Sequence, residues 1–91
     1  MTGDQARMAR AALKLSVREV AAAAKVSPNT VTRVEAGSAV NNSTLAAIRG
    51  ALEAAGVEFI AENGGGAGVR LRKARGDGSI PPDDLNASND E

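Results

Sequence analysis

The sequence contains no cysteine and no histidine among its 91 residues. Their absence excludes disulfide bonds, thiolate nucleophiles and Cys/His zinc sites, and it removes imidazole as a general base. The N-terminal segment lacks the apolar region of a secretory signal, and no apolar run approaches the roughly 20 residues needed to cross a bilayer. We therefore expect a cytoplasmic protein with no membrane contact, no metal and no cofactor.

Acidic residues are sparse in the first part of the chain, and basic residues are missing from its end. Residues 1–75 hold all eleven lysines and arginines with six acidic residues, a net charge of +5. Residues 76–91 hold the other five acidic residues, a net charge of −5. A basic body favours an anionic partner, although a solvated surface with a solubilising tail would have the same charges. A chain this short forms one small domain with a marginal core, which dimerisation would stabilise.

Four segments within residues 1–56 have the periodicity of helices, at about residues 4–14, 17–24, 28–36 and 43–55. Asp4 can cap the first helix or favour its start, Ser16 begins the second with a capping-box pattern, and Ser27 caps the third. Gly37 and Gly56 end the third and fourth helices. The expected inner faces are Met8, Ala11, Ala12 and Leu15, then Val20, Ala21 and Ala24, then Val31 and Val34, then Leu45, Ile48 and Leu52.

The apolar period changes from helical to alternating after residue 56. Two alternating segments around a glycine-rich turn predict a β-hairpin over residues 57–73. Its side chains Val57, Phe59, Val69 and Leu71 are expected to cover the core of the domain. Ile60 and an open strand edge then remain for contact with a second copy, so the hairpin is the expected dimerisation element. Residues 74–91 lack periodicity and are expected to form a disordered acidic tail.

One stretch has a more specific pattern than periodicity alone. Leu15-Ser16 precedes the second helix, Ala21 lies in its middle, Val26-Ser27 forms the turn, and RVEAG follows at residues 33–37. This pattern resembles the helix-turn-helix of phage repressors and Cro, the XRE family of bacterial and phage regulators. The resemblance covers about residues 5–56 and implies a four-helix domain that binds double-stranded DNA.

The resemblance also implies roles for individual side chains. The third helix would enter the major groove, where Asn29 can bond adenine, Arg33 can bond guanine or a phosphate, and Thr32 offers a hydroxyl and a methyl group. The positions expected to face DNA are Ser27, Pro28, Asn29, Thr30, Thr32 and Arg33. Three of them have simpler explanations: Ser27 as a cap, Pro28 as a helix starter, and Thr30 as a hydrogen-bonding partner within the first turn.

Further positions depend on the same resemblance. Arg10 of the first helix is expected to pair with Glu35, which ties the first helix to the third. Lys25 lies where the family has glycine, so it is expected to hold the turn under strain and to reach a phosphate. Asn41 and Asn42 are expected to help bind phosphate at the start of the fourth helix, although capping by Asn42 or Ser43 explains this loop equally well.

No group of residues in the sequence indicates an enzyme. NGGGAG at residues 63–68 lacks the helix and the GK[ST] ending of a phosphate-binding loop, and no nucleophile accompanies a general base. The leading hypothesis is a homodimeric regulator, in its simplest form a repressor, that binds an inverted-repeat operator. One alternative is an antitoxin that autoregulates through the same DNA-binding unit and masks a toxin with its acidic tail or its hairpin. The other is a protein-binding module that has lost DNA contact.

Overall fold

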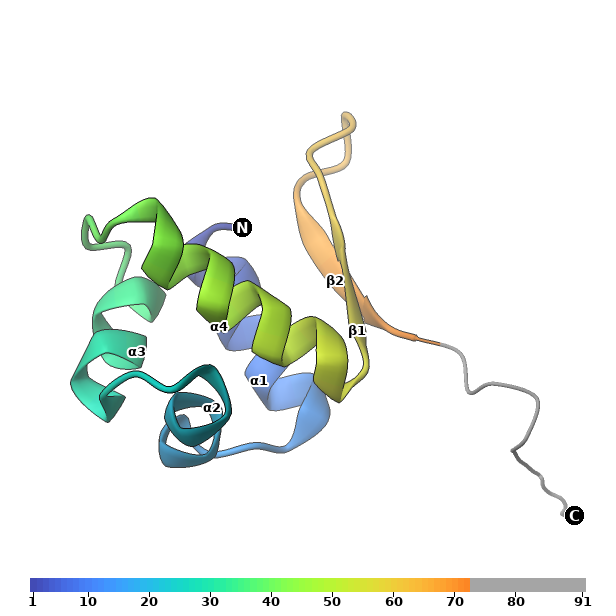
Figure 1. Cartoon of the computed structure of the whole chain (residues 1–91). Helices are drawn as coiled ribbons and strands as arrows, with labels where there is room; N and C mark the ends of the chain where they lie inside the picture. The colour runs from blue at the N-terminus through green and yellow to red at the C-terminus, as the bar shows by residue number, and fades with distance from the viewer. Residues whose placement is uncertain (73–91) are drawn as a thin grey trace, which may run out of the picture.

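The computed structural model describes residues 1–72, which form four helices followed by a two-stranded antiparallel sheet (Figure 1). The helices are α1 (Gly3–Leu13), α2 (Val17–Ala24), α3 (Pro28–Glu35) and α4 (Asn42–Ala55), and the strands are β1 (Val57–Ile60) and β2 (Gly68–Leu71). The predicted mainly helical fold with a C-terminal hairpin is confirmed. The predicted disorder of residues 74–91 concerns a segment outside the described residues.

The N-terminal caps of α2 and α3 are those that the sequence predicts. The Ser16 hydroxyl accepts a hydrogen bond from the Glu19 amide, and the Glu19 carboxylate accepts one from the Ser16 amide. Ser27 caps α3, and Pro28 occupies the first helical position, where its missing N–H removes no helical hydrogen bond. These two caps fix where each helix of the pair begins.

The caps of α1 and α4 differ from those expected. Thr2 caps α1 in a capping box with Gln5, while Asp4 lies in the first turn and only favours the helix dipole. Asn41 caps α4, in place of Asn42 or Ser43, because the helix begins one residue earlier than its apolar pattern indicates. Cap chemistry is common to Thr, Ser, Asp and Asn, so sequence alone does not select among neighbours of these types.

The core lies where the four helices meet the base of the hairpin. Its largest fully buried side chains are Ile48, Leu52, Val20, Val31 and Val57. The predicted inner faces of α2 and α3 are confirmed, while Leu45 in α4 is only partly buried. Since α2 and α3 each have only eight residues, this burial is the main source of their helical stability.

The inner face of α1 is not the predicted one. Gln5, Ala6 and Ala9 are buried, whereas Met8 is 39% exposed and Ala11 is exposed. The two small alanines let α1 pack closely on α3 and α4, so the bulkier Met8 lies outside. The prediction for Met8 and Ala11 was wrong because apolar spacing does not distinguish two overlapping helix faces when one contains only small residues.

The hairpin packs on α1 and α4 and pairs Val57 with Leu71, Phe59 with Val69, and Ile60 with Gly68. Phe59 and Val69 are partly buried against the core, and the Arg49 guanidinium lies 5.3 Å from the centre of the Phe59 ring. Leu71 was expected to cover the core, but it is 55% exposed. Its cross-strand partner Val57 is fully buried and fills the contact with the core at that end of the hairpin.

Gln5 joins the far end of the hairpin to α1. Its side-chain Nε2 donates to the carbonyl oxygens of Ile60 and Gly68, at 3.0 and 2.9 Å, and its Oε1 accepts from the Thr2 amide at 2.9 Å. This amide is only 5% exposed, yet its donors and acceptor all have partners. The hairpin is therefore attached to α1 by specific hydrogen bonds as well as by apolar packing.

Helices α1 and α4 separate the hairpin from the α2–α3 pair, which lies at the other side of the molecule (Figure 1). Within residues 1–72, no helix combines the length and the apolar character that crossing a membrane requires. The fold thus has two exposed ends of different construction, one made of short helices and one made of strands.

Candidate nucleic-acid interface

Helices α2 and α3 are joined by a three-residue turn, Lys25, Val26 and Ser27. Val31 and Val34 fix the inner face of α3 in the core, which leaves Asn29, Thr32 and Arg33 exposed on its outer face. An exposed helix of this kind, braced by a second helix across a short turn, has the shape that fits the major groove of B-DNA.

Lys25 forms the turn in the left-handed conformation, with a φ of 60°, and its N–H donates to the carbonyls of Ala21 and Ala22. A side chain at positive φ costs about 1 kcal/mol relative to glycine. The sequence predicts this strain from the lysine at a position where the resembling family has glycine. The ammonium is exposed next to the start of α3, so the strained residue adds a positive charge there.

The first turn of α3 uses much of its own hydrogen-bonding capacity. The Ser27 hydroxyl accepts from the Thr30 amide at 3.1 Å and lies 2.8 Å from the Thr30 hydroxyl. Thr30 is partly buried. The simpler explanations of these two residues, a cap and a partner within the first turn, therefore describe contacts that the structure contains.

The outer face of α3 keeps more capacity free. The Thr32 hydroxyl donates to the Pro28 carbonyl at 3.2 Å, and one Arg33 nitrogen donates to the Ala39 carbonyl at 3.3 Å. Both groups retain sites for further bonds, since a hydroxyl has two acceptor positions and a guanidinium has five N–H donors. Asn29 forms no side-chain hydrogen bond with any of residues 1–72. Its amide can therefore bond an external partner without breaking an internal contact.

The loop before α4 lies beside this face. A groove of about 340 Å³ between α3 and the loop is lined by Thr30, Arg33, Ala39, Val40, Asn41 and Thr44. The Asn41 side-chain oxygen accepts from the Thr44 amide and the Ser43 hydroxyl, both at 2.8 Å, so it acts as a cap. Asn42 is exposed at the first position of α4. The structure thus brings Asn41 next to α3 in this groove, while Asn42 is exposed at the start of α4 and does not line the groove.

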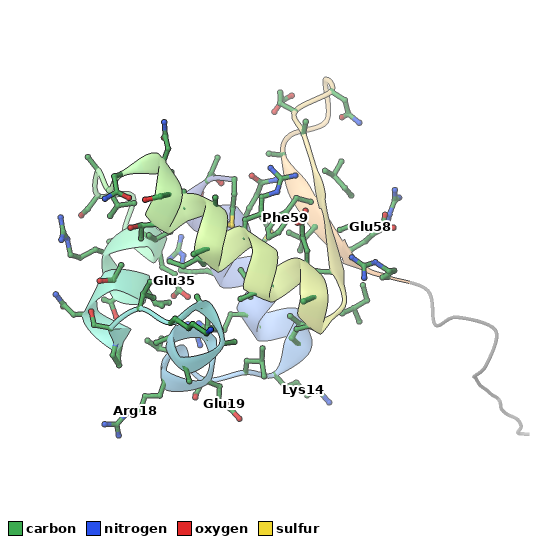
Figure 2. The ribbon with its side chains drawn as sticks, in the orientation of Figure 1. Lys14, Arg18, Glu19, Glu35, Glu58 and Phe59 are labelled. Atoms are coloured by element: carbon green, nitrogen blue, oxygen red, sulfur yellow. The ribbon has the colours of Figure 1, made fainter. Side chains whose placement is uncertain are left out.

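The C-terminal end of α3 is held by an ion pair to α1. Arg10 Nε lies 2.7 Å from Glu35 Oε2, and Arg10 Nη2 lies 3.0 Å from Glu35 Oε1. The Glu35 side chain is 9% exposed and points toward the interior in Figure 2. The hydrogen bond to Glu35 raises the pKa of Arg10 above its ordinary value, against the opposing effect of burial. Arg10 therefore stays charged throughout the physiological range, and the pair does not respond to alkaline pH through this residue.

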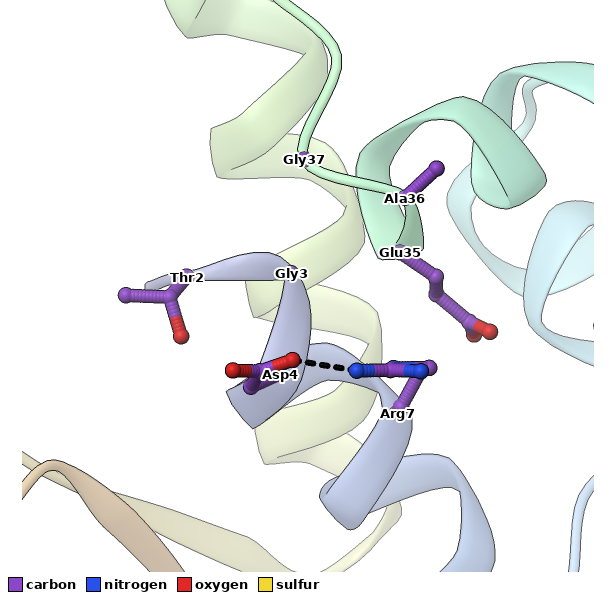
Figure 3. Close-up of a pocket in the computed structure, with 7 residues that line it drawn as sticks. All are labelled: Thr2, Gly3, Asp4, Arg7, Glu35, Ala36 and Gly37. Atoms are coloured by element: carbon purple, nitrogen blue, oxygen red, sulfur yellow. Dashed lines mark hydrogen bonds and ion pairs between the residues drawn. The ribbon is translucent and has the colours of Figure 1, made fainter.

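Backbone contact reinforces this junction. A Cβ atom on Gly3 would lie 2.5 Å from the Val34 carbonyl oxygen and 2.8 Å from the Glu35 carbonyl oxygen, so only glycine allows this approach. The start of α1 and the end of α3 together line a pocket of about 350 Å³, where Arg7 also pairs with Asp4 (Figure 3). Periodicity gives no signal for Gly3, because its constraint comes from a helix more than thirty residues away.

Ion pairing separates the charges of residues 1–72 into two groups. All four ion pairs lie outside the turn and the outer face of α3: Arg7–Asp4, Arg10–Glu35, Arg49–Glu53 and Arg70–Glu58. Glu19 and Glu62 accept backbone N–H groups instead. Among the described residues, the basic side chains without a carboxylate partner are Lys14, Arg18, Lys25, Arg33 and Arg72.

Three of these five cations, Arg18, Lys25 and Arg33, lie on α2, the turn and α3, and Lys14 caps the end of α1 just before α2. We call the set of Lys14, Arg18, Lys25 and Arg33 the basic surface. Figure 2 shows Lys14 and Arg18 pointing away from the body at the side where α2 lies. Sequence reasoning missed Arg18, although a basic residue in the first turn of a helix opposes the helix dipole and for that reason suggests an external role.

These elements define a helix-turn-helix with a basic, hydrogen-bonding outer face. In agreement, the model of a family described as a helix-turn-helix domain matches residues 3–59, and the chain belongs to that family. Comparison with curated proteins gave no match. Membership of this family supports a DNA-binding regulator. Among residues 1–72, no group of three or more His, Cys, Asp or Glu side chains could hold a metal ion.

Proposed function

We propose that this protein is a sequence-specific transcription regulator of the phage-repressor and Cro type, which binds an inverted-repeat operator as a homodimer. The observation that carries the proposal is the outer face of α3. Among residues 1–72, the Asn29 side chain on this face has no hydrogen-bond partner, and Arg33 on the same face and Lys25 in the preceding turn have no carboxylate partner. Solubility alone does not require unpaired basic side chains to be grouped around the helix-turn-helix.

In the proposed complex, α3 lies in the major groove with its first turns against base edges. Asn29 bonds adenine bidentately, and Arg33 bonds guanine or a phosphate through the N–H groups that the Ala39 carbonyl leaves free. Thr32 contributes its methyl group and its free acceptor sites. Ser27, Pro28 and Thr30 bring the start of α3 close to the DNA, with their side chains acting inside the helix.

Phosphate contacts would flank these base contacts. Lys25 projects from the turn on one side of α3, and Arg18 and the loop with Asn41 and Asn42 belong to neighbouring elements. Contacts of this kind fix the position of the protein on the duplex and make its affinity depend on salt. A repressor needs no further domain, because a bound dimer can occlude the promoter.

A dimer is required because one α3 reads only a few base pairs, and two must lie about one helical turn, roughly 34–36 Å, apart. The hairpin is the proposed dimerisation element. Val57 is fully buried in its own core, and Phe59 and Val69 pack against that core, so these residues support the hairpin. Ile60 lies on the opposite face of the hairpin from Val57 and Phe59, and it remains for the second copy together with the open edges of the two-stranded sheet. Leu71 is exposed at the other end of the hairpin.

Helix α1 would transmit the spacing between the two α3 helices. It bonds the hairpin through Gln5 and the end of α3 through Arg10, and both contacts lie on one helix of 11 residues. Helix α1 therefore connects the proposed dimer contact with the reading helix. The antitoxin alternative keeps the same DNA-binding unit and adds a toxin partner at the hairpin or at residues 76–91, which lie outside the described residues.

The proposal can be tested by selecting DNA from a pool of random-sequence duplexes with the full chain. We expect enrichment of an inverted repeat whose half-sites are centred about 10 base pairs apart. The bound complex should contain two chains per duplex by light scattering. Failure to enrich any sequence, while binding remains independent of salt, would contradict a DNA-binding role.

A further inference from the structure

The basic surface has a second anionic candidate partner within the chain itself. We propose that the acidic segment of residues 76–91 binds the basic surface of its own chain and competes there with DNA. This inference rests on the proposed DNA-binding function, and it assigns a regulator to that same surface. The segment brings five carboxylates and no basic residue, and its acidic residues are Asp77, Asp83, Asp84, Asp90 and Glu91.

The position where the described chain ends favours this contact. The Arg72 amide donates to the Gly56 carbonyl at 2.7 Å, and a Cβ on Gly56 would lie 3.8 Å from a methyl group of Leu13. The next residue after Leu13 is Lys14, the first cation of the basic surface. The described chain therefore ends beside the C-terminal end of α1, and Lys14 and Arg18 lead from there to the α2–α3 turn.

The length of the segment is sufficient. An extended chain spans about 3.3–3.6 Å per residue, so Asp77 can lie up to about 17 Å from Arg72, and Glu91 can lie more than 60 Å away. The longest dimension of the structure is 45 Å. Every cation of the basic surface is thus within reach, including Arg33 on the far side of the turn.

The carboxylates already in the body do not compete for these cations. Asp4, Glu35, Glu53 and Glu58 are paired with other arginines, and Glu19 and Glu62 accept backbone N–H groups.

The expected size of the competition follows from the tether. We take an effective concentration of the segment on the order of 1 mM and a dissociation constant for the basic surface on the order of 0.1–0.5 mM. Competition then lowers the apparent DNA affinity about three- to tenfold. The effect should fade as the screening length falls to about 3 Å near 1 M salt.

The absence of cysteine makes a direct test simple. A spin label on the full chain at Ser88→Cys reacts at one site, and it broadens the NMR signals of amides that approach it. Without DNA and at low salt, we expect broadening at residues 14–33, and we expect it to disappear at high salt. A matched full-length variant with Asp77→Asn, Asp83→Asn, Asp84→Asn, Asp90→Asn and Glu91→Gln should lose the broadening and bind a non-specific duplex three- to tenfold more tightly at low salt.

Other outcomes separate the two proposals. Broadening confined to the neighbourhood of Arg72, or spread evenly over the body, would overturn the proposed contact. Broadening of unlabelled chains in a mixed sample would assign the segment to a second copy and would also contradict it. If the broadening occurs at residues 14–33 but neither form binds DNA, the segment contact stands and the proposed function fails.

Discussion

Two polar surfaces of this molecule differ in how much of their hydrogen-bonding capacity the fold uses. Where α1 meets its neighbours, Gln5 makes three hydrogen bonds and Arg10 makes a two-point ion pair with Glu35. On the outer face of α3, Asn29 bonds none of residues 1–72 and Arg33 makes one contact of 3.3 Å. Both surfaces contain amides and guanidinium groups, so residue type alone does not distinguish structure from recognition.

The difference shows which effects substitutions should have. Buried polar groups with satisfied partners stabilise a fold only as complete sets, since loss of one partner leaves the other buried and unpaired. Exposed groups with free capacity contribute little to folding and remain available for a ligand. Variants in the first surface should therefore change stability, and variants in the second should change DNA affinity.

The largest expected effect is that of Glu35→Ala. We expect the free energy of unfolding to fall by about 3 kcal/mol, the lower part of the range for a broken buried pair, because Arg10 keeps partial access to solvent. Urea denaturation measures this, and DNA affinity should fall as a consequence. Combining Glu35→Leu with Arg10→Met should recover part of the loss, whereas unchanged stability of Glu35→Ala would assign the pair no structural role.

The next largest effect is expected for Gln5→Glu, which should lower the free energy of unfolding by about 2 kcal/mol at neutral pH. The substituted carboxylate can still accept from the Thr2 amide, but it donates nothing to the Ile60 and Gly68 carbonyls and places a charge beside them. Asp4→Asn, a change on an exposed residue of the same helical turn, is the matched control and should cost less than about 0.5 kcal/mol. Equal stabilities of the two variants would show that the hairpin does not depend on Gln5.

Asn29→Ala should have the opposite effect from the two stability variants, because it should lower DNA affinity and leave the free energy of unfolding unchanged. We expect operator affinity to fall about ten- to hundredfold, the equivalent of roughly 1–3 kcal/mol for one good base contact. Arg33→Ala should give a similar loss. If both variants keep full affinity for the selected operator, α3 is not the reading helix.

Lys25→Gly should have the smallest effect. It should raise the stability of the fold and lower DNA affinity. Glycine relieves the left-handed strain and should raise the free energy of unfolding by about 0.5–1 kcal/mol. DNA affinity should fall, and its dependence on salt should decrease by about one phosphate contact. Lys14→Gly is a matched control, since Lys14 has a φ of 59° at the end of α1. It should give the same stabilisation with a smaller effect on DNA binding.

Local patterns were enough to predict the helices, the hairpin and two of the four caps. Ser16, Ser27 and the alternation after Gly56 each act through neighbours within a few residues, so the sequence contains the whole signal. The resemblance added the Arg10–Glu35 contact, whose partners are 25 residues apart and which the structure contains. The roles of Asn29, Arg33 and the hairpin remain proposals.

Apart from the Arg10–Glu35 pair, which the resemblance implied, contacts between distant elements could not be predicted. Gln5 has the appearance of an ordinary first-turn residue, yet its amide bonds carbonyls more than fifty residues away. Gly3 is required by the backbone of α3, and Leu71 is exposed although its cross-strand partner Val57 is fully buried. The segregation of unpaired charge to the basic surface likewise emerges only after the ion pairs are known.

The most direct test of DNA binding by α2 and α3 is an NMR titration of the full chain with a short duplex at low salt. Amide signals of residues 14–33 and of the loop at Asn41 and Asn42 should shift in proportion to the bound DNA. Signals of Ile60, Gly68 and Val69 in the hairpin should stay in place at protein concentrations high enough for the proposed dimer to form before DNA is added. Shifts centred on the hairpin, or no shifts at saturating duplex, would contradict the assignment of this surface to DNA.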